Sequence, residues 1–230
     1  MAEFVFAPPA TVAVPVTDGR LFPVRRIFCV GRNYAAHARE MGGDPTREPP
    51  FFFTKPADAV VLEGQDIPYP SQTSALHHEV ELVVAIGTGG RDIPVAQALS
   101  HVFGYAVGLD LTRRDLQDEA KATRRPWDMS KSFDASAPIS AIKPVAACGH
   151  PALGRISLVV NGTQRQVGDL ADQIWAVPEI IASLSQFVAL SAGDLIFTGT
   201  PEGVGALQKG DKLVAEIETI GTLRTNIKGE

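Results

Sequence analysis

The stretch Leu76-His77-His78-Glu79-Val80-Glu81-Leu82-Val83-Val84-Ala85-Ile86 decides how we interpret this chain. Its Val, Leu and Ile content predicts a buried or half-buried strand, in which successive side chains point to opposite faces. Glu79 and Glu81 are then expected on one face beside His77. Two like charges next to a core repel each other and lose hydration, so one must be neutralised or a cation must bridge them. The alternative is a solvated strand face, because glutamate is mostly exposed in proteins.

A third carboxylate follows the next predicted strand, Val102 to Leu109, which ends at Asp110. Three carboxylates provide all-oxygen ligation, which suits Mg²⁺ or Mn²⁺ and leaves positions for substrate and water. An N-cap is the alternative role of Asp110, since a helix is predicted from about Thr112 to Thr123. Arg114 and Gln117 share a face of that helix at i, i+3 and could grip a substrate carboxylate. The alternative is a pair of plain surface residues.

A second pair, His37 and Glu40, lies at i, i+3 on a short helix predicted from Asn33 to Met41. A carboxylate that orients an imidazole makes it a better general base. Glycines at both ends of this helix, Gly31 and Gly42-Gly43, would let it move as a lid that brings the pair to the metal. An exposed surface pair is the alternative interpretation.

The composition favours a globular protein: of 230 residues, 45% are hydrophobic and 20% are charged. No apolar run approaches the roughly 18 residues of a spanning helix, and the N-terminus lacks the pattern of a signal peptide, so we expect a cytoplasmic protein without membrane association. The two cysteines, Cys29 and Cys148, are predicted to be reduced packing residues. A net charge of −5 gives no reason to expect nucleic-acid binding.

The chain is predicted to form one domain, residues 25–230, preceded by a Pro-rich extended arm over residues 1–24. Asn161-Gly162 predicts a hairpin turn, and Pro178 opens a core helix with apolar residues at helical spacing. Strands outnumber helices and no regular alternation of strand and helix appears. We therefore predict an α+β architecture with mostly antiparallel strands.

Six segments, in order along the chain, resemble the fumarylacetoacetate hydrolase family. They are Cys29-Val30-Gly31-Arg32-Asn33-Tyr34-Ala35-Ala36-His37, Phe53-Thr54-Lys55-Pro56, His77 to Leu82, Gly108 to Gln117, Lys131-Ser132-Phe133-Asp134 and Thr198 to Gly205. The resemblance implies a β-rich mixed-sheet roll with a few peripheral helices, a homodimer, and cleavage of carbon–carbon bonds in acylpyruvates or related 1,3-diketones.

The resemblance also implies roles for individual residues. The implied ligands of Mg²⁺ or Mn²⁺ are Glu79, Glu81 and Asp110, and His37 with Glu40 matches a pair that activates water. The residues implied to bind the keto acid end of the substrate or to stabilise developing negative charge are Lys131, Arg114, Gln117 and Thr200. His77 is expected to support the ligands without binding the metal. Lys55 and Lys143 are expected to be ordinary surface lysines.

Two longer segments, residues 47–60 and 125–134, look most like bacterial fumarylpyruvate hydrolases of the gentisate pathway. The expected reaction is hydrolysis of fumarylpyruvate, a small 2-keto acid, to fumarate and pyruvate in aromatic catabolism. The alternatives are a general acylpyruvate hydrolase, an oxaloacetate decarboxylase or a keto-enol tautomerase. A non-enzymatic alternative is a protein in which the metal only clamps strands together.

Overall fold

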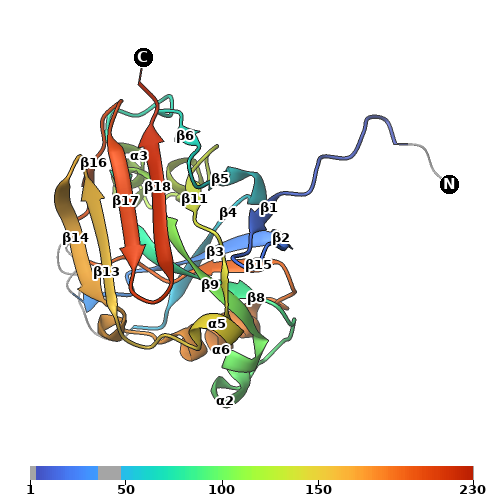
Figure 1. Cartoon of the computed structure of the whole chain (residues 1–230). Helices are drawn as coiled ribbons and strands as arrows, with labels where there is room; N and C mark the ends of the chain where they lie inside the picture. The colour runs from blue at the N-terminus through green and yellow to red at the C-terminus, as the bar shows by residue number, and fades with distance from the viewer. Residues whose placement is uncertain (1–3, 36–47, 230) are drawn as a thin grey trace.

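The computed structural model of this chain describes residues 4–35 and 48–229 (Figure 1). Its largest sheet has eight strands, of which seven follow one another in the spatial order β4-β3-β15-β8-β9-β11-β5 and the eighth, β12, pairs with β9. Their bounds are β4 (Phe51–Lys55), β3 (Arg26–Gly31), β15 (Asp194–Phe197), β8 (Val80–Ile86), β9 (Val102–Leu109), β11 (Ala137–Ile139), β5 (Val60–Leu62) and β12 (Lys143–Pro144).

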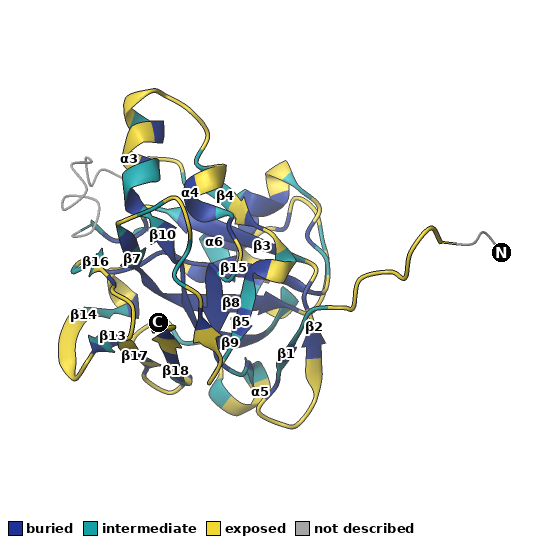
Figure 2. Ribbon diagram, turned by 90° about the horizontal axis from the view of Figure 1, so that it is seen from above, coloured by how far each residue is buried: buried dark blue, intermediate teal, exposed yellow. Residues whose placement is uncertain are grey.

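Both faces of this sheet are buried, and strand β8 shows why (Figure 2). Its apolar residues alternate between two cores: Leu82 and Val84 join one cluster, and Val83 and Ala85 join the other. Since side chains of a strand alternate between faces, a strand buried on both sides is apolar throughout. The predicted strand is therefore confirmed, and it is fully buried.

The first core lies between the eight-stranded sheet and a five-stranded sheet, whose strands after residue 150 appear in orange and red in Figure 1. The five strands are β14 (Thr163–Asp169), β13 (Arg155–Val160), β17 (Lys212–Ile217), β18 (Gly221–Ile227) and β6 (Asp66–Ile67). Asn161, at φ 51°, and Gly162, at φ 78°, form the predicted turn between β13 and β14. Helix α6 (Val177–Phe187) completes this core with its apolar face, as predicted from Pro178.

A small three-stranded sheet joins the two larger ones near the start of β8. It contains β10 (Thr112–Arg113), β7 (Leu76–His78) and β16 (Gly205–Ala206). The remaining helices are short and lie outside the sheets: α2 (Val95–Ala98), α3 (Arg114–Ala122), α4 (Asp128–Lys131), α5 (Val145–Cys148) and the 3₁₀ turns η1 (Ala57–Ala59), η2 (Leu99–His101) and η3 (Leu170–Asp172). The predicted β-rich mixed-sheet roll with a few peripheral helices is confirmed.

Near the N-terminus, β1 (Ala13–Pro15) and β2 (Leu21–Pro23) form a hairpin that packs on the second core through Val14 and Phe22. Residues 4–11 run away from the body in Figure 1. The division into an arm over 1–24 and a domain over 25–230 stays a prediction. In the described part of the chain, no helix is both long and apolar enough to cross a membrane.

The helix predicted from Asn33 to Met41 falls largely outside the described residues. Asn33 itself is buried, and its side chain donates to the carbonyls of Trp175 (2.9 Å) and Thr198 (2.7 Å) and accepts from the Trp175 amide (2.7 Å). The side-chain hydrogen bonds that the structure gives for Asn33 therefore connect the end of β3 to the segments around Trp175 and Thr198.

We expect Gly108→Ala to destabilise the fold, because Gly108 on β9 packs against side chains of β8 and β15. A Cβ atom at Gly108 would lie 2.5 Å from Phe197 Cε1 and 2.6 Å from Val83 Cγ2. Overpacking of this kind costs about 1–3 kcal/mol of unfolding free energy. Urea denaturation measures the change, and Gly229→Ala, where a Cβ atom meets nothing within 4 Å, is the control. Equal stability of both variants would show that the sheet core adapts freely.

Candidate metal centre and active site

Strand register brings the three acidic residues together. In the antiparallel pair of β8 and β9, Glu81 lies opposite Gly108, and the Asp110 amide continues the ladder by donating to the Glu79 carbonyl at 2.9 Å. Directly opposed residues have neighbouring Cβ atoms, so Glu79 and Asp110 form a cross-strand pair. One carboxylate oxygen from each of Glu79, Glu81 and Asp110 lies within 4.8 Å of the others. Gly108 adds no side chain beside Glu81.

All three carboxylates are buried, with Glu79 5%, Glu81 2% and Asp110 1% exposed. The interpretation as a solvated strand face with surface glutamates is therefore wrong. Burial, followed by the nearby charges of Asp110 and Glu79, raises the pKa of Glu81 well above its ordinary value. The Gly199 amide opposes this shift by donating to Glu81 Oε2 at 2.8 Å.

Three cations surround the carboxylates. Lys131 Nζ, at the end of α4, donates to Glu79 Oε2 at 2.7 Å and to Asp110 Oδ2 at 2.6 Å. Arg114, at the start of α3, donates to Glu79 Oε1, and Lys55 Nζ lies 2.8 Å from Asp110 Oδ1. Burial alone lowers the pKa of Lys131, but the Asp110 and Glu79 carboxylates outweigh it and the net shift is upward. The three cations contact Glu79 and Asp110, whereas Glu81 accepts a hydrogen bond from the Gly199 amide.

Lys55 corrects a prediction, because it is not a surface lysine. Its side chain is 0% exposed, and Nζ donates to the Leu111 carbonyl at 3.1 Å and to the Lys131 carbonyl. These bonds tie the end of β4 to the segments that carry Asp110 and Lys131. Lys143, the other lysine expected on the surface, is only partly buried and donates to the Thr219 carbonyl at 2.7 Å.

Helix α3 begins at Arg114, with Arg113 in the N-cap position. Asp110 therefore does not cap this helix, and that alternative is wrong. As predicted, Arg114 and Gln117 share one face, where Arg114 Nη1 donates to Gln117 Oε1 at 2.5 Å. Both residues are buried and line a cleft that the three carboxylates also line, so they are not plain surface residues.

Gln166 is a residue that the sequence did not reveal. Its Oε1 accepts from the Val80 amide at 3.1 Å and lies 2.9 Å from His78 Nδ1, and its Nε2 donates to Thr200 Oγ1 at 2.8 Å. Because Thr200 Oγ1 accepts this bond, its own hydroxyl proton is left to donate elsewhere. Gln166 thus joins β14 to the start of β8 and orients the hydroxyl that faces the cleft. No local motif marks it, since its partners come from distant segments.

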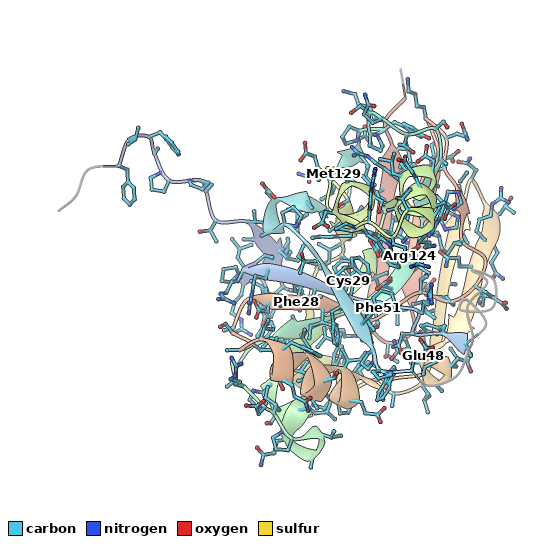
Figure 3. All side chains as sticks on the ribbon, turned by 180° about the vertical axis from the view of Figure 1, so that it is seen from behind. Phe28, Cys29, Glu48, Phe51, Arg124 and Met129 are labelled. Atoms are coloured by element: carbon cyan, nitrogen blue, oxygen red, sulfur yellow. The ribbon has the colours of Figure 1, made fainter. Side chains whose placement is uncertain are left out.

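The cleft is bounded by β4, α3 and α4, and α4 lies against both of the others. Figure 3 shows Phe51 on β4 with α4, marked by Met129, above it. Glu79, Glu81, Asp110, Arg114, Gln117, Lys131 and Thr200, all singled out from the sequence, line this one cleft. His77 is absent from the ligand group; burial, with the charge of Arg114, lowers its pKa to about 4, so it is neutral at pH 7. His37 and Glu40 lie outside the described residues.

The residues present fit a divalent metal. Three carboxylates close enough to share one ion form the hard oxygen set that Mg²⁺ and Mn²⁺ prefer. Lys131 contacts two of the same three carboxylates, so an ammonium group and a metal compete for these oxygens.

Comparison with known proteins identifies the family of this chain and relatives with two different activities. Residues 26–228 match the family model described as fumarylacetoacetate (FAA) hydrolase C-terminal. A crystal structure of fumarylpyruvate hydrolase from Pseudomonas aeruginosa, in complex with Mn²⁺ and pyruvate, is similar over 99% of this chain and 100% of that chain, with 53% identity and a TM-score of 0.96. A candidate fumarylpyruvate hydrolase from Burkholderia cenocepacia is 56% identical, with full coverage of both chains and a TM-score of 0.93. The mitochondrial oxaloacetate tautomerase FAHD1 of Rattus norvegicus is 43% identical over 204 residues, 89% of this chain and 92% of that protein.

We expect Glu81→Gln to weaken Mn²⁺ binding, because the amide replaces one of the three carboxylates that could hold the ion while keeping the shape of the side chain. The affinity should fall by more than about 100-fold, beyond the 10–100-fold typical of residues that only support a ligand. Calorimetric titration with Mn²⁺ measures this, with Glu119→Gln on the exposed side of α3 as control. Unchanged affinity in Glu81→Gln would show that the metal binds elsewhere.

We expect Lys55→Met to reduce the unfolding free energy by about 3–5 kcal/mol, because it leaves Asp110 buried with one partner fewer. Lys143→Met, which removes a partly exposed lysine, should change stability by less than about 1 kcal/mol. Chemical denaturation of both variants in metal-free buffer compares them. If the two losses are equal, the buried contact of Lys55 with Asp110 does not support the fold.

Proposed function

This chain belongs to the fumarylacetoacetate hydrolase family, and on that basis we propose that it is a metal-dependent hydrolase that cleaves a carbon–carbon bond in an acylpyruvate. The observation that carries the proposal is the buried carboxylate triad at the inner end of a cleft lined by Arg114, Gln117 and Lys131. The substrate that we propose is fumarylpyruvate, which would yield fumarate and pyruvate. The similarity to the Pseudomonas aeruginosa fumarylpyruvate hydrolase supports this choice.

The inner residues suit the keto acid end of such a substrate. We propose that Glu79, Glu81 and Asp110 hold Mg²⁺ or Mn²⁺, which when bound supplies a Lewis acid that polarises the 2-keto oxygen. Arg114 and Gln117 offer planar donors to the substrate carboxylate, as a guanidinium does in a bidentate pair. Their mutual hydrogen bond fixes their relative orientation before the substrate arrives.

Charge stabilisation explains how these residues would accelerate cleavage. Breaking the bond next to the distal carbonyl releases pyruvate as its enolate, so negative charge grows at the inner end of the cleft. The Lys131 ammonium and the Thr200 hydroxyl line this end, and the hydrogen bond from Gln166 already orients Thr200. Donors that are fixed in place where charge develops stabilise the transition state more than the ground state.

Attack on the distal carbonyl requires an activated water molecule. We propose His37 as the base that takes the proton from water and Glu40 as the carboxylate that orients it. These roles rest on the match of the two residues to the family pattern. Activation of water belongs to the hydrolase proposal alone, because decarboxylation needs no attacking water and tautomerisation needs only the transfer of a proton.

Oxaloacetate tautomerisation or decarboxylation is the second candidate function. The 43% identity to the rat oxaloacetate tautomerase favours it. The inner cleft would serve this reaction equally, since it too passes through an enolate of a 2-keto acid. A structural metal protein is the non-enzymatic alternative: there, Mg²⁺ would raise thermal stability and no 2-keto acid would be consumed. The homodimer, the cytoplasmic location and the role in aromatic catabolism also stay proposals.

Substrate disappearance measured by ultraviolet absorbance, with fumarylpyruvate, a simple acylpyruvate and oxaloacetate in parallel, tests the proposed function. We expect fumarylpyruvate to give the highest kcat/KM in the presence of Mg²⁺ or Mn²⁺. Turnover of oxaloacetate without hydrolysis of either acylpyruvate would replace the proposal by its second candidate. Stabilisation by Mg²⁺ with no turnover of any substrate would support the structural alternative.

We expect His37→Ala to separate the two reactions. Acylpyruvate hydrolysis should fall by about 10² to 10⁴-fold, as is typical for loss of a general base. Oxaloacetate decarboxylation should fall less, because Lys131 and the carboxylates still hold the enolate. Metal affinity, measured by calorimetry, should stay unchanged. Hydrolysis that survives while oxaloacetate decarboxylation collapses would contradict the roles we assign.

A further inference from the structure

Two more cations, Arg32 and Lys121, line the same cleft outside the group of residues that would bind the keto acid end of the substrate. Arg32 follows β3, and Lys121 lies in the last turn of α3. Both are less buried than the inner cations: Arg32 is exposed and the Lys121 side chain is 26% exposed, whereas Lys131 is 3% exposed. They therefore belong to the outer part of the cleft.

The position of Lys121 follows from helical periodicity. Arg114, Gln117 and Lys121 are spaced i, i+3 and i+7, which places them in one stripe along α3. All three line the cleft. Seven residues of α-helix span about 10 Å, at about 1.5 Å per residue. The stripe therefore begins at the carboxylate triad and carries positive charge outward for a distance that suits a substrate with a chain of several carbons.

The positive charges of Arg32, Arg114 and Lys121 are close enough to interact with one another. The pKa of Lys121 is lowered first by burial and then by the positive charges of Arg114 and Arg32. Asp118 is a weak partner for Lys121, since its Oδ1 lies 3.6 Å from Nζ and its side chain is 61% exposed to water. The carboxylates of Glu79 and Asp110 are already in contact with Lys55, Lys131 and Arg114. Among the described residues that line the cleft, Arg32 and Lys121 therefore add positive charge to its outer part.

Two aromatic rings hold the outer cations in place. Lys121 Nζ lies 5.6 Å from the centroid of the Trp127 ring, and Arg32 Cζ lies 6.0 Å from that of Phe51. The two rings meet edge to face at 5.3 Å. Phe51 reaches this position because Gly31 has no side chain: a Cβ atom there would lie 1.9 Å from Phe51 Cζ. The rings offer apolar walls for an acyl chain between the inner and outer cations.

Arg32 also has an unfavourable backbone conformation. Its φ of 58° lies in the left-handed region, which residues other than glycine occupy at a cost. The surrounding structure must hold it there, since Asn33 is fixed by its bonds to Trp175 and Thr198. This conformation places the Arg32 side chain at the cleft together with Phe51.

We propose that Arg32 and Lys121 bind a second carboxylate at the far end of the substrate, so that this site selects 2-keto acids with an anionic acyl group over those with a neutral one. The inference rests on the proposed function for the inner end of the cleft. It adds the residues that determine which acyl group is preferred. Charge-assisted hydrogen bonds of this kind contribute enough to separate two ligands by about 10-fold or more.

A matched pair of ligands tests this without hydrolysis. 2-Oxoheptanedioate and 2-oxoheptanoate have the same length and differ by one terminal carboxylate, and neither has the second keto group that hydrolysis requires. Calorimetry with the Mn²⁺-loaded protein should show at least about 10-fold tighter binding of the dianion. In Lys121→Met and in Arg32→Gln this preference should shrink several-fold, while the affinity for 2-oxoheptanoate stays the same.

Two controls separate charge from structure. Arg91→Gln removes an exposed arginine that pairs only loosely with Asp92, at 3.9 Å, and should leave the preference unchanged. Lys121→Arg keeps the charge and should retain most of the preference. If the wild-type protein binds both ligands equally, or if Lys121→Met and Arg32→Gln weaken both ligands equally, the outer site is refuted. Absence of acylpyruvate turnover would instead refute the proposed hydrolase, whatever the ligand preference.

Discussion

The rest of the structure depends on neutralising three buried carboxylates at the ends of β8 and β9. Glu79, Glu81 and Asp110 are almost completely removed from water, and isolated buried charges are too costly for a fold to keep. Compensation comes from three separate peripheral elements: Lys55 from β4, Lys131 from α4 and Arg114 from α3. These elements are therefore held against the sheet by ion pairs as well as by apolar contacts. The short helix α4 has four residues and would have little stability of its own.

The same compensation creates the cleft. Because β4, α3 and α4 each deliver a cation to the triad, their other side chains are brought into register around the space above it. Helix α3 contributes its stripe of Arg114, Gln117 and Lys121, and β4 and the loop before α4 contribute Phe51 and Trp127. The ion pairs at the triad therefore also position the residues that form the walls of the cleft. A divalent ion held by the triad would share the Glu79 and Asp110 carboxylates with the Lys131 ammonium.

Local patterns in the sequence predicted a large part of the residues that form the site. Alternation along a strand gave the shared face of Glu79 and Glu81, the strand end gave Asp110, and helical spacing gave Arg114 with Gln117. Lys55 and Gln166 could not be found in this way, because their importance comes from pairing with segments far away in the chain: Lys55 with Asp110, and Gln166 with Val80 and Thr200. The N-cap interpretation of Asp110 failed for a related reason. The chain first adds the short strand β10, paired with β7, before helix α3 begins.

On the proposed roles, the inner and outer parts of the cleft contact different parts of the substrate. On the proposed roles, the triad, Lys131, Arg114 and Gln117 serve any 2-keto acid that passes through an enolate, so similarity both to a fumarylpyruvate hydrolase and to an oxaloacetate tautomerase is consistent with one inner site. Selection between these substrates must then come from groups that touch the parts in which they differ. Those parts are the length and charge of the acyl group. The residues that meet them are the aromatic walls and the cations Arg32 and Lys121, so divergence in specificity within such a scaffold requires no change in the residues that balance its buried charge.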